Sequence, residues 1–466
     1  MTQLANTNYA RFLAQKKPKP QKSGFSVDPD ALPSKMFGWQ KQAVVWSLEQ
    51  GRSALFEECG LGKSFQQIAW ADQVANYAKK PVLILAPLAV AGQTVREGEK
   101  LGIEITHARD DSQVKGGVNI TNYERLEHFD TSRFAGVVLD ESSILKSFSG
   151  TTKRALVQSF ANTPYRLPCT ATPSPNDFME LGNHGEFLGV MPSNEMLARW
   201  FINDTASFGS YRLKGHAERD FWEWVASWAV CLSCPSDLTG NPLDDCGYQL
   251  PKLNEIPVDI EVDLTQNTDG RLFRSGTLNA TGMHREKRLS LSERVSKAAE
   301  IANSASGQVV VWCETNDESA RLKSTIPDAV EVKGSDSPDA KESRLTAFTE
   351  GRARVIVSKP SIAGFGLNWQ GCSEMVFTSL TFSFESYYQA VRRCYRFGQK
   401  NEVNVHLLAA PTERAIIDTL ARKREQHAQM QAQMSAAMRR VSGVTQSARE
   451  LQTSAGNSPV QVPFWL

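Results

Sequence analysis

The sequence predicts an α/β protein with two parallel-sheet domains and a helical protrusion inserted after the first. Short, continuously apolar runs such as Val82–Leu85 alternate with helix-like segments, a pattern typical of parallel strands that are covered on both faces. The same alternation starts again after about residue 250. The chain has 466 residues, which is more than one hydrophobic core usually holds, so two domains are expected.

The first domain is predicted over residues 34–250, after a polar arm at residues 1–33. The arm carries a Lys/Pro-rich stretch at residues 15–22, which is typical of a flexible tether and could also touch phosphates. An apolar stretch, Ser53–Phe56, is the first strand-like run. The later runs expected to form strands are Val82–Leu85, Gly117–Ile120, Gly136–Leu139 and Tyr165–Pro168.

An aromatic, helix-like stretch at about 178–245 predicts the accessory protrusion of this domain. Phe221, Trp224, Val225 and Trp228 follow the i, i+3, i+4, i+7 spacing of one helix face. These rings could stack nucleic-acid bases. The helical spacing favours packing into a core instead.

The second domain is predicted over residues 251–423, after the linker-like Leu250–Leu253. The remaining residues, 424–466, predict a tail that is helical to about Arg440 and then disordered. The apolar end of this tail, residues 464–466, could dock on a protein partner or fold back onto the body. The strands expected in the second domain are Val309–Trp312, Val355–Val357, Met375–Phe377 and Val403–Leu407.

Charge and cysteine content restrict the class of protein only loosely. Lys and Arg total 52 and Asp and Glu total 51, so any nucleic-acid surface must be built locally. The eight cysteines lack the dense spacing of a secreted disulfide scaffold, which favours a reducing compartment. The first twenty residues lack a signal-peptide core, and the longest apolar run, Val82–Ala91, is too short to span a bilayer. A cytoplasmic location and no membrane partner are expected.

Two further groups of residues have a functional and a structural interpretation. Cys231, Cys234 and Cys246 offer three thiolates, and a zinc site would need a fourth ligand such as His216. Simple burial of free cysteines is favoured over that site. His184 could be taken for a catalytic base, but no partner pattern accompanies it, so a packing role is favoured.

The segment Glu57–Ser64 has the layout of a phosphate-binding loop, because it lies between an apolar strand and a helix-like run. In such loops the backbone N–H groups surround a β-phosphate, while Lys63 would contact the β- and γ-phosphates and the Ser64 hydroxyl would contact Mg²⁺. The strict pattern has glycine where this chain has Glu57. The residues assigned to the nucleotide in this loop are Gly60, Leu61, Gly62, Lys63 and Ser64.

Hydrolysis of a bound nucleotide also needs acidic residues, and Asp140 and Glu141 supply them. They end the apolar strand Gly136–Leu139, which places both carboxylates at the carboxyl edge of the sheet, where open α/β folds bind ligands. Asp140 would hold Mg²⁺ and Glu141 would polarise the attacking water.

With these motifs in place, the chain resembles the superfamily-two helicases, and among them the Snf-type translocases of double-stranded DNA. The resemblance covers about residues 36–413 and explains Glu57, because the family's loop starts with an acidic residue. Asp140–Ser143 keeps the two acids of the family's Asp-Glu-Ala-His and changes the last two residues. The further matching segments are Phe37–Gln40, Ala86–Leu88, Thr121–Glu124, Lys146, Thr170–Pro173, Asn176, Gly364–Asn368, Gln389–Gln399 and Thr412–Glu413.

The resemblance implies site residues in both domains. Gln40 stands where the family reads adenine, and Gly366 lies in the motif near DNA backbone and nucleotide. Arg393 and Arg396 stand where the family's two arginines reach across a cleft to the γ-phosphate, a role that suits a planar guanidinium.

The resemblance implies two RecA-like domains and an ATP- and Mg²⁺-dependent motor that moves on DNA. Its partner would be duplex DNA, contacted mainly through phosphates. The alternatives are an RNA-directed or strand-separating helicase, and an ATP-switched DNA-binding clamp that recruits partners without processive movement. The compact core is similar to bacterial or phage versions, so bacterial or host cytoplasm is expected.

Overall fold

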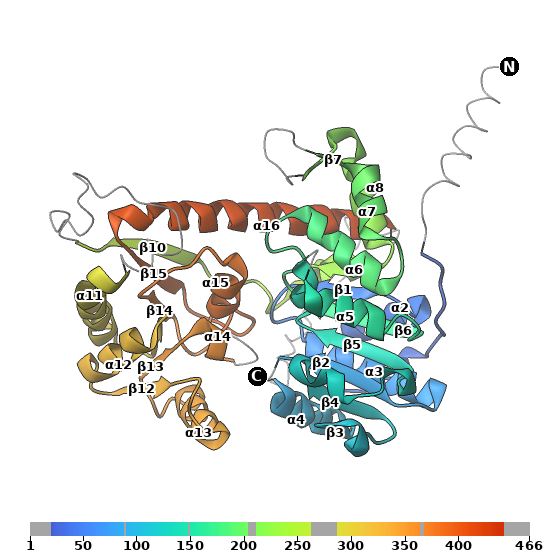
Figure 1. Ribbon diagram of the computed structural model, residues 1–466, viewed down its shortest axis with the longest axis horizontal. Helices are drawn as coiled ribbons and strands as arrows, with labels where there is room; N and C mark the ends of the chain where they lie inside the picture. Colours follow the sequence, from blue (N-terminus) through green and yellow to red (C-terminus); the bar gives the residue numbers. More distant parts are fainter. Residues whose placement is uncertain are drawn as a thin grey trace. The chain divides into compact units, whose positions relative to one another are not determined.

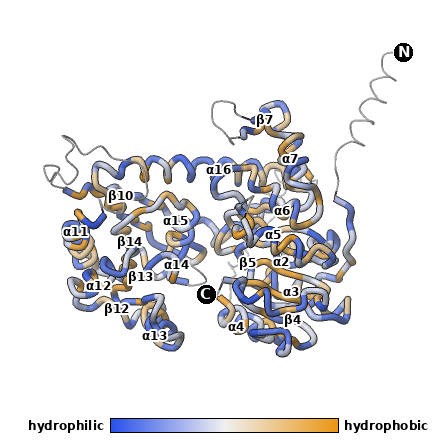
Figure 2. Tube along the Cα trace, viewed as in Figure 1, coloured by the Kyte–Doolittle hydropathy of each residue, from blue (hydrophilic) through white to orange (hydrophobic). Residues whose placement is uncertain are grey.

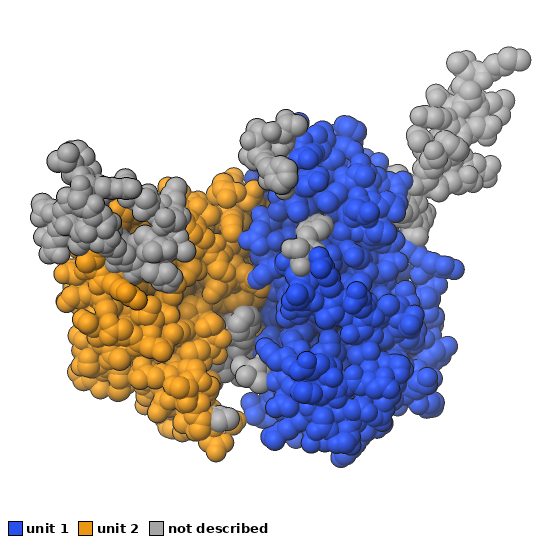
Figure 3. Space-filling model, in the orientation of Figure 1, with its two compact units in different colours: residues 1–246, 427–466 blue, residues 247–426 orange. Residues whose placement is uncertain are grey.

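The computed structural model divides the chain into two compact units, which Figure 3 colours separately. Unit 1 comprises residues 1–246 and 427–466, and unit 2 comprises residues 247–426. The residues that the structure describes are 20–87, 90–147, 150–203, 211–261, 287–363 and 368–441.

Unit 1 is built on a parallel sheet, which has seven strands in the described part of the chain. Every neighbouring pair is parallel, which confirms the predicted sheet type. The strands at the centre are fully buried, as continuous apolar runs require. In sheet order the strands are β3 (Ile105–His107), β4 (Val118–Asn122), β2 (Val82–Ala86), β5 (Gly136–Asp140), β6 (Tyr165–Thr170), β1 (Ala54–Glu57) and β9 (Ala229–Leu232).

Helices pack on this sheet, and a glycine marks the end of one of them. α2 (Gly38–Gln50) ends at Gly51, whose φ of 76° suits a glycine after a helix. α3 (Lys63–Ala78) follows β1 and packs against β2 and β5 (Figure 1). Two further helices of unit 1 are α4 (Ala91–Leu101) and α5 (Thr151–Ser159).

The aromatic region contains α6 (Leu181–Leu188), α7 (Ser193–Trp200), α8 (Glu218–Ala226) and the hairpin strands β7 (Phe201–Asn203) and β8 (Tyr211–Leu213). Phe221, Val225 and Trp228 have no exposed surface, and Trp224 is 4% exposed. The rings of Trp224 and Trp228 meet edge to face at 5.3 Å between centroids. The packing interpretation of this helix face is therefore confirmed, and stacking of bases on it is ruled out by burial.

One part of the predicted protrusion belongs to the main sheet. β9 pairs in parallel with β1 over its full length, and the Glu58 N–H donates to the Leu232 carbonyl at 2.9 Å. The stretch 178–245 is therefore not wholly accessory, because its last strand lies beside the strand that leads into the phosphate-binding loop. The sequence pattern did not predict this strand, because Ala229–Leu232 closely follows the aromatic helix without a turn signal.

Unit 2 also has a parallel sheet, with six strands among the described residues. Its core includes Val309, Val311, Val355 and Val357, all fully buried. The chain that reads as a linker passes directly into β10, which pairs with β15 along seven residues. In sheet order the strands are β10 (Leu253–Asp259), β15 (Val403–Ala409), β14 (Glu374–Phe377), β11 (Val309–Trp312), β13 (Val355–Ser358) and β12 (Ala329–Val332).

Several helices of unit 2 begin with a capping side chain. Thr315 Oγ1 accepts from the Glu318 N–H, and the Glu318 carboxylate accepts from the Thr315 N–H in return, which is a capping box. Ser337 caps a helix whose first residue is proline. The helices are α11 (Leu291–Ser304), α12 (Asn316–Thr325), α13 (Pro338–Thr349), α14 (Pro360–Ala363) and α15 (Phe384–Val391).

The long helix α16 (Arg414–Val441) is divided between the units, with residues from His427 onward in unit 1. Its colouring in Figure 2 is largely hydrophilic, but Met430, Met434 and Met438 are buried. The predicted domain limit at residue 423 falls inside this helix. The predicted disordered end and its docking residues, 464–466, lie outside the described residues.

Shorter elements complete the described chain, and no helix in it is both long and apolar enough to cross a membrane. They are α9 (Ser236–Thr239) and the 3-10 turns η1 (Pro29–Ala31), η2 (Asp111–Gln113), η3 (Tyr123–His128), η4 (Thr131–Arg133), η5 (Ser142–Lys146), η6 (Phe178–Glu180), η7 (Gly215–Ala217), η8 (Pro242–Asp245) and η9 (Pro411–Glu413).

Candidate nucleotide-binding site

The predicted phosphate-binding loop joins β1 to α3 at the carboxyl edge of the unit 1 sheet. Gly60 and Gly62 have φ angles of 93° and 74°, which side chains other than glycine rarely adopt. Gly62 is the residue that precedes α3, so the loop ends on the N-terminus of a helix. Backbone N–H groups and the helix dipole favour an anion at such a position.

The Lys63 ammonium group binds its own loop. Nζ donates to the carbonyl oxygen of Glu57 at 2.8 Å and to that of Glu58 at 3.1 Å. The positive charge is therefore held against the concave side of the loop, where the phosphate-binding pattern places it.

Glu57 is the residue that replaces the usual glycine, and its side chain is buried at 1% exposure. Oε2 accepts from Gln66 Nε2 at 2.7 Å, while Oε1 is buried without a hydrogen-bond partner in the described structure. Burial raises the pKa of this carboxyl to about 7, although the charge of Lys63 and the bond from Gln66 act in the opposite direction.

β5 ends at Asp140 and Glu141 follows it directly, so both acids lie, as predicted, at the same sheet edge as the loop. Gln67 Nε2, from α3, donates to Asp140 Oδ1 at 2.8 Å and so links the loop helix to the acidic pair. Thr170 Oγ1, at the end of β6, donates to Glu141 Oε2 at 3.3 Å. The structure therefore brings together the loop, both acids and the threonine of the Thr170–Pro173 motif.

The backbone around Glu141 is unusual. Glu141 has φ 54° and ψ 56°, a left-handed conformation that is uncommon for a residue with a side chain. The Tyr123 hydroxyl donates to the Asp140 carbonyl at 2.7 Å. Ser142 Oγ lies 3.1 Å from His184 Nε2, within hydrogen-bond distance. The residues on both sides of Glu141 are thus tied to other elements.

Glu97, on α4, is a site residue that the sequence reasoning did not identify. Its Oε1 accepts from Gln93 Nε2 at 2.8 Å, and its Oε2 is buried without a hydrogen-bond partner. Burial raises the pKa of Glu97, the hydrogen bond from Gln93 lowers it, and the charge of Asp140 raises it further. The carboxyl therefore lies near enough to Asp140, one of the two predicted Mg²⁺ ligands, for their charges to interact. No spacing rule links α4 to the loop, so the sequence alone gave no signal.

Gln40 is buried on α2 and is held at both ends of its amide. Oε1 accepts from the Phe37 N–H at 3.1 Å, and Nε2 donates to the Leu61 carbonyl of the loop at 2.9 Å. This places the predicted adenine-reading residue directly on the phosphate-binding loop.

The predicted arginines of unit 2 follow α15 and have different surroundings. Arg393 is 5% exposed, and its Nε and NH2 groups donate to Gln389 O and Oε1, both at 3.0 Å. Arg396 is half-buried. Gly366 lies outside the described residues.

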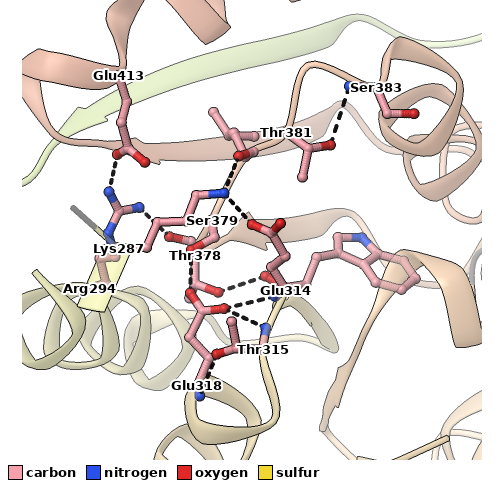
Figure 4. Close-up of polar contacts among 12 residues, drawn as sticks. Lys287, Arg294, Glu314, Thr315, Glu318, Thr378, Ser379, Thr381, Ser383 and Glu413 are labelled. Atoms are coloured by element: carbon pink, nitrogen blue, oxygen red, sulfur yellow. Dashed lines mark hydrogen bonds and ion pairs between the residues drawn. The ribbon is translucent and has the colours of Figure 1, made fainter. Parts of the chain in front are cut away.

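Unit 2 carries a buried polar network at the carboxyl ends of β11 and β14, shown in Figure 4. Lys287 pairs with Glu314 and donates to the Leu380 carbonyl at 2.7 Å. Arg294 pairs with Glu413, and both side chains are almost fully buried. Glu413, in a segment that resembles a family motif, is therefore a structural partner within unit 2.

A cavity of about 190 Å³ opens beside this network, and every residue that lines it belongs to unit 2. Its polar residues include Lys359, Ser361, Thr381 and Ser386. The lining also includes the carboxylate of Glu314, which pairs with Lys287.

The cysteines offer no support for a zinc site. All eight are free thiols, and Cys231 is buried whereas Cys246 is exposed. Among the described residues no group of three or more His, Cys, Asp or Glu side chains could hold a metal ion. Burial raises the pKa of Cys234 to about 11.

A parallel sheet that carries a phosphate-binding loop and, at the same edge, two acids at the end of another strand, together with a second α/β unit, defines a nucleotide-binding protein of the P-loop class. Residues 39–208 match the SNF2-related domain, and residues 292–398 match the helicase conserved C-terminal domain. The chain therefore belongs to the Snf-type helicases of superfamily two, as its motifs predict.

Similar proteins include the DNA annealing helicase and endonuclease ZRANB3 of Mus musculus, which is 24% identical over 436 residues. That match covers 82% of this chain and 39% of the relative, so the chain spans about two fifths of the relative's length. The human DNA excision repair protein ERCC-6 is 28% identical over 216 residues, covering 36% of this chain and 14% of its own.

Among solved structures, the Sulfolobus solfataricus SWI2/SNF2 ATPase core in complex with double-stranded DNA aligns with 93% of this chain and 100% of its own. The sequence identity is 17% and the TM-score is 0.41.

Proposed function

We propose that the protein is an ATP-dependent DNA translocase that couples ATP hydrolysis to movement along duplex DNA. The observation that carries this proposal is the convergence of Lys63, Asp140 and Glu141 at one sheet edge of an SNF2-related domain. These are the groups needed to hold a nucleoside triphosphate and to activate water against it.

The residues around the loop fit a bound Mg²⁺ ion. The Ser64 hydroxyl and the Asp140 and Glu97 carboxyl groups supply oxygen ligands, which Mg²⁺ prefers. The buried Glu97 Oε2 atom has no hydrogen-bond partner in the described structure, as expected for an oxygen that serves a cation or its water shell. Mg²⁺ bound there would neutralise charge on the β- and γ-phosphates.

Hydrolysis in this site would divide its tasks among the chain's own side chains. Lys63 would turn from its loop carbonyls toward the phosphates, Asp140 would orient the cation, and Glu141 would accept the proton of the attacking water. Thr170 is hydrogen-bonded to Glu141, so a movement of Glu141 on nucleotide binding would be transmitted to β6 and to the motif that follows it. We further propose that Arg396 stabilises the charge that spreads over the transferred phosphoryl group.

DNA is the proposed track because the relatives named above are described as acting on DNA. The unit 2 cavity is lined by Lys359 and several hydroxyl groups, which can donate to phosphate oxygens, and also by the Glu314 carboxylate, which cannot. Such contacts would give binding that depends weakly on sequence and strongly on salt.

The test is the rate of ATP hydrolysis without nucleic acid and with duplex DNA, single-stranded DNA or RNA. We expect stimulation by duplex DNA, and loss of turnover in Glu141→Gln with ATP binding retained. Stimulation by RNA alone would identify an RNA-directed helicase instead. ATP binding without DNA-stimulated turnover would indicate the switched clamp.

A further inference from the structure

The strained backbone at Glu141 needs an explanation beyond the motif itself. A left-handed conformation costs a residue with a side chain about 1 to 2 kcal/mol and persists only where the surroundings impose it. Glu141 is also the residue whose carboxylate must face a water molecule in a fixed direction. Whatever holds its two neighbours in place therefore determines where that carboxylate points.

The two neighbours of Glu141 are held by side chains from different parts of unit 1. Before it, the Tyr123 hydroxyl donates to the Asp140 carbonyl at 2.7 Å. After it, the Ser142 hydroxyl meets His184 Nε2 at 3.1 Å. Ser142 stands at one of the two positions where this chain departs from Asp-Glu-Ala-His. The hydroxyl group that this departure introduces has His184 as its partner.

His184 is placed to be a fixed anchor. It lies on α6 with no exposed surface, and its ring meets that of Phe56, on β1, edge to face at 5.0 Å between centroids. Burial lowers the pKa of His184 to about 3, although the backbone carbonyls of Glu180 and Ser142 oppose this shift. The imidazole is therefore neutral near pH 7, which suits a hydrogen-bond partner and not a general base.

We propose that His184 is a positioning residue that holds Glu141, through Ser142, in the orientation needed to activate the hydrolytic water. This inference rests on the proposed ATP hydrolysis. The competing explanation is that His184 only fills space between α6 and β1. The two explanations differ in what they predict for the turnover of fully folded variants.

The experiment is a double-mutant cycle with Ser142→Ala, His184→Leu and the variant that carries both. Each single change leaves one buried polar group unpaired, whereas the double change leaves an apolar pair. We expect each single variant to lower kcat about 10- to 100-fold, because small misplacements of reacting groups are costly. The KM for ATP and the affinity for a non-hydrolysable ATP analogue should change less than about 3-fold, as expected when a change acts on the chemical step alone.

The double variant should lose no more kcat than the more impaired single variant, because the two residues act as one unit. Val225→Ala, a buried change on α8, is the control for lost stability. All assays are run well below the melting temperature of each variant. Ser142→Ala removes one oxygen atom only, so it keeps the test open if His184→Leu does not fold.

Unchanged kcat in the folded single variants would overturn the inference, as would losses that match those of Val225→Ala at equal stability. Independent, multiplicative losses in the double variant would also overturn it. If the wild-type protein hydrolyses no ATP, the proposed function fails, and this inference fails with it. If the wild-type protein hydrolyses ATP and the variants do so at the same rate, the positioning role is refuted and the proposed function is not.

Discussion

At the scale of single residues, the buried carboxyl of Glu57 makes stability depend on pH. Its pKa is about 7 in the folded protein and near the ordinary 4.5 in the unfolded chain. Between these values the unfolded chain releases the proton while the folded protein keeps it, so stability falls as pH rises through this window. Above pH 7 the cost reaches about 3 kcal/mol.

Glu57→Gln should remove this cost, because a glutamine stays neutral and can still accept from Gln66. We expect the free energy of unfolding of the variant, relative to wild type, to be up to about 3 kcal/mol higher at pH 8 than at pH 5. Urea unfolding at the two pH values measures it. Glu99→Gln, an exposed change on α4, should show no such difference. An equal effect of Glu57→Gln at both pH values would contradict the assignment.

The arginines after α15 provide a second residue-scale prediction. Arg396→Ala should lower kcat by about 10³-fold while ATP still binds, as expected for a group that stabilises phosphoryl charge. The matched control is Arg392→Ala, because the Arg392 guanidinium already lies over the rings of Tyr388 and Tyr395. The two variants are compared by their steady-state rates of ATP hydrolysis. Equal losses of kcat would refute the assignment to Arg396.

At the scale of secondary-structure elements, α8 and β9 connect the aromatic region to the phosphate-binding loop. Trp228 lies between them, fully buried, and its ring contacts Phe56 on β1 at 5.7 Å between centroids. Trp228→Ala should therefore cost about 3 to 5 kcal/mol of stability. DNA affinity, measured below the melting temperature, should not change. Leu243→Ala, which removes an exposed side chain, is the control, and a selective loss of DNA affinity in Trp228→Ala would revive the base-stacking interpretation.

The elements also show what the sequence could and could not predict. Continuous apolar runs such as Val82–Ala86 announce buried parallel strands because both of their faces are covered. β10 (Leu253–Asp259) escaped notice because it is half-exposed and contains Pro257, which is uncommon inside a strand. Pairing with β15 stabilises it, and that contact joins segments far apart in the chain.

The same distinction applies to the site. Asp140 and Glu141 could be predicted because they stand directly at a strand end after a phosphate-binding loop. Glu97 and His184 could not, because their places depend on how α4 and α6 pack against the sheet. Motif spacing predicts the residues on the loop itself. The residues that support them are placed by tertiary contacts, which motif spacing does not predict.

At the scale of the whole molecule, unit 1 includes the end of α16. Gln431 Nε2 donates to Glu58 Oε2 of the phosphate-binding loop at 2.8 Å, and Arg439 Nε donates to the buried Asp237 at 3.1 Å. Ser435 meets Ser233 at 3.1 Å between hydroxyl oxygens. This half of the helix is thus part of the fold around the loop.

A chain that ends at residue 426 should therefore be less stable in unit 1 than one that ends at residue 441. Removing residues 427–441 exposes the surface that Met430, Met434 and Met438 cover, at about 2 to 3 kcal/mol for each buried side chain. Thermal unfolding and limited proteolysis of the two chains, with nucleotide binding as a second readout, would show the difference. Equal melting temperatures would show that the helix end is dispensable.

The division of α16 also sets the order in which the protein can be completed during synthesis. The first stretch of unit 1 ends at residue 246, but its last helical segment, residues 427–441, is made only after all of unit 2. At about 5 to 20 residues per second, the nascent unit waits roughly 10 to 40 seconds for that segment. During this interval the surface beside Asp237 is uncovered, so the nascent chain exposes to aggregation and to chaperones a surface that the finished protein covers.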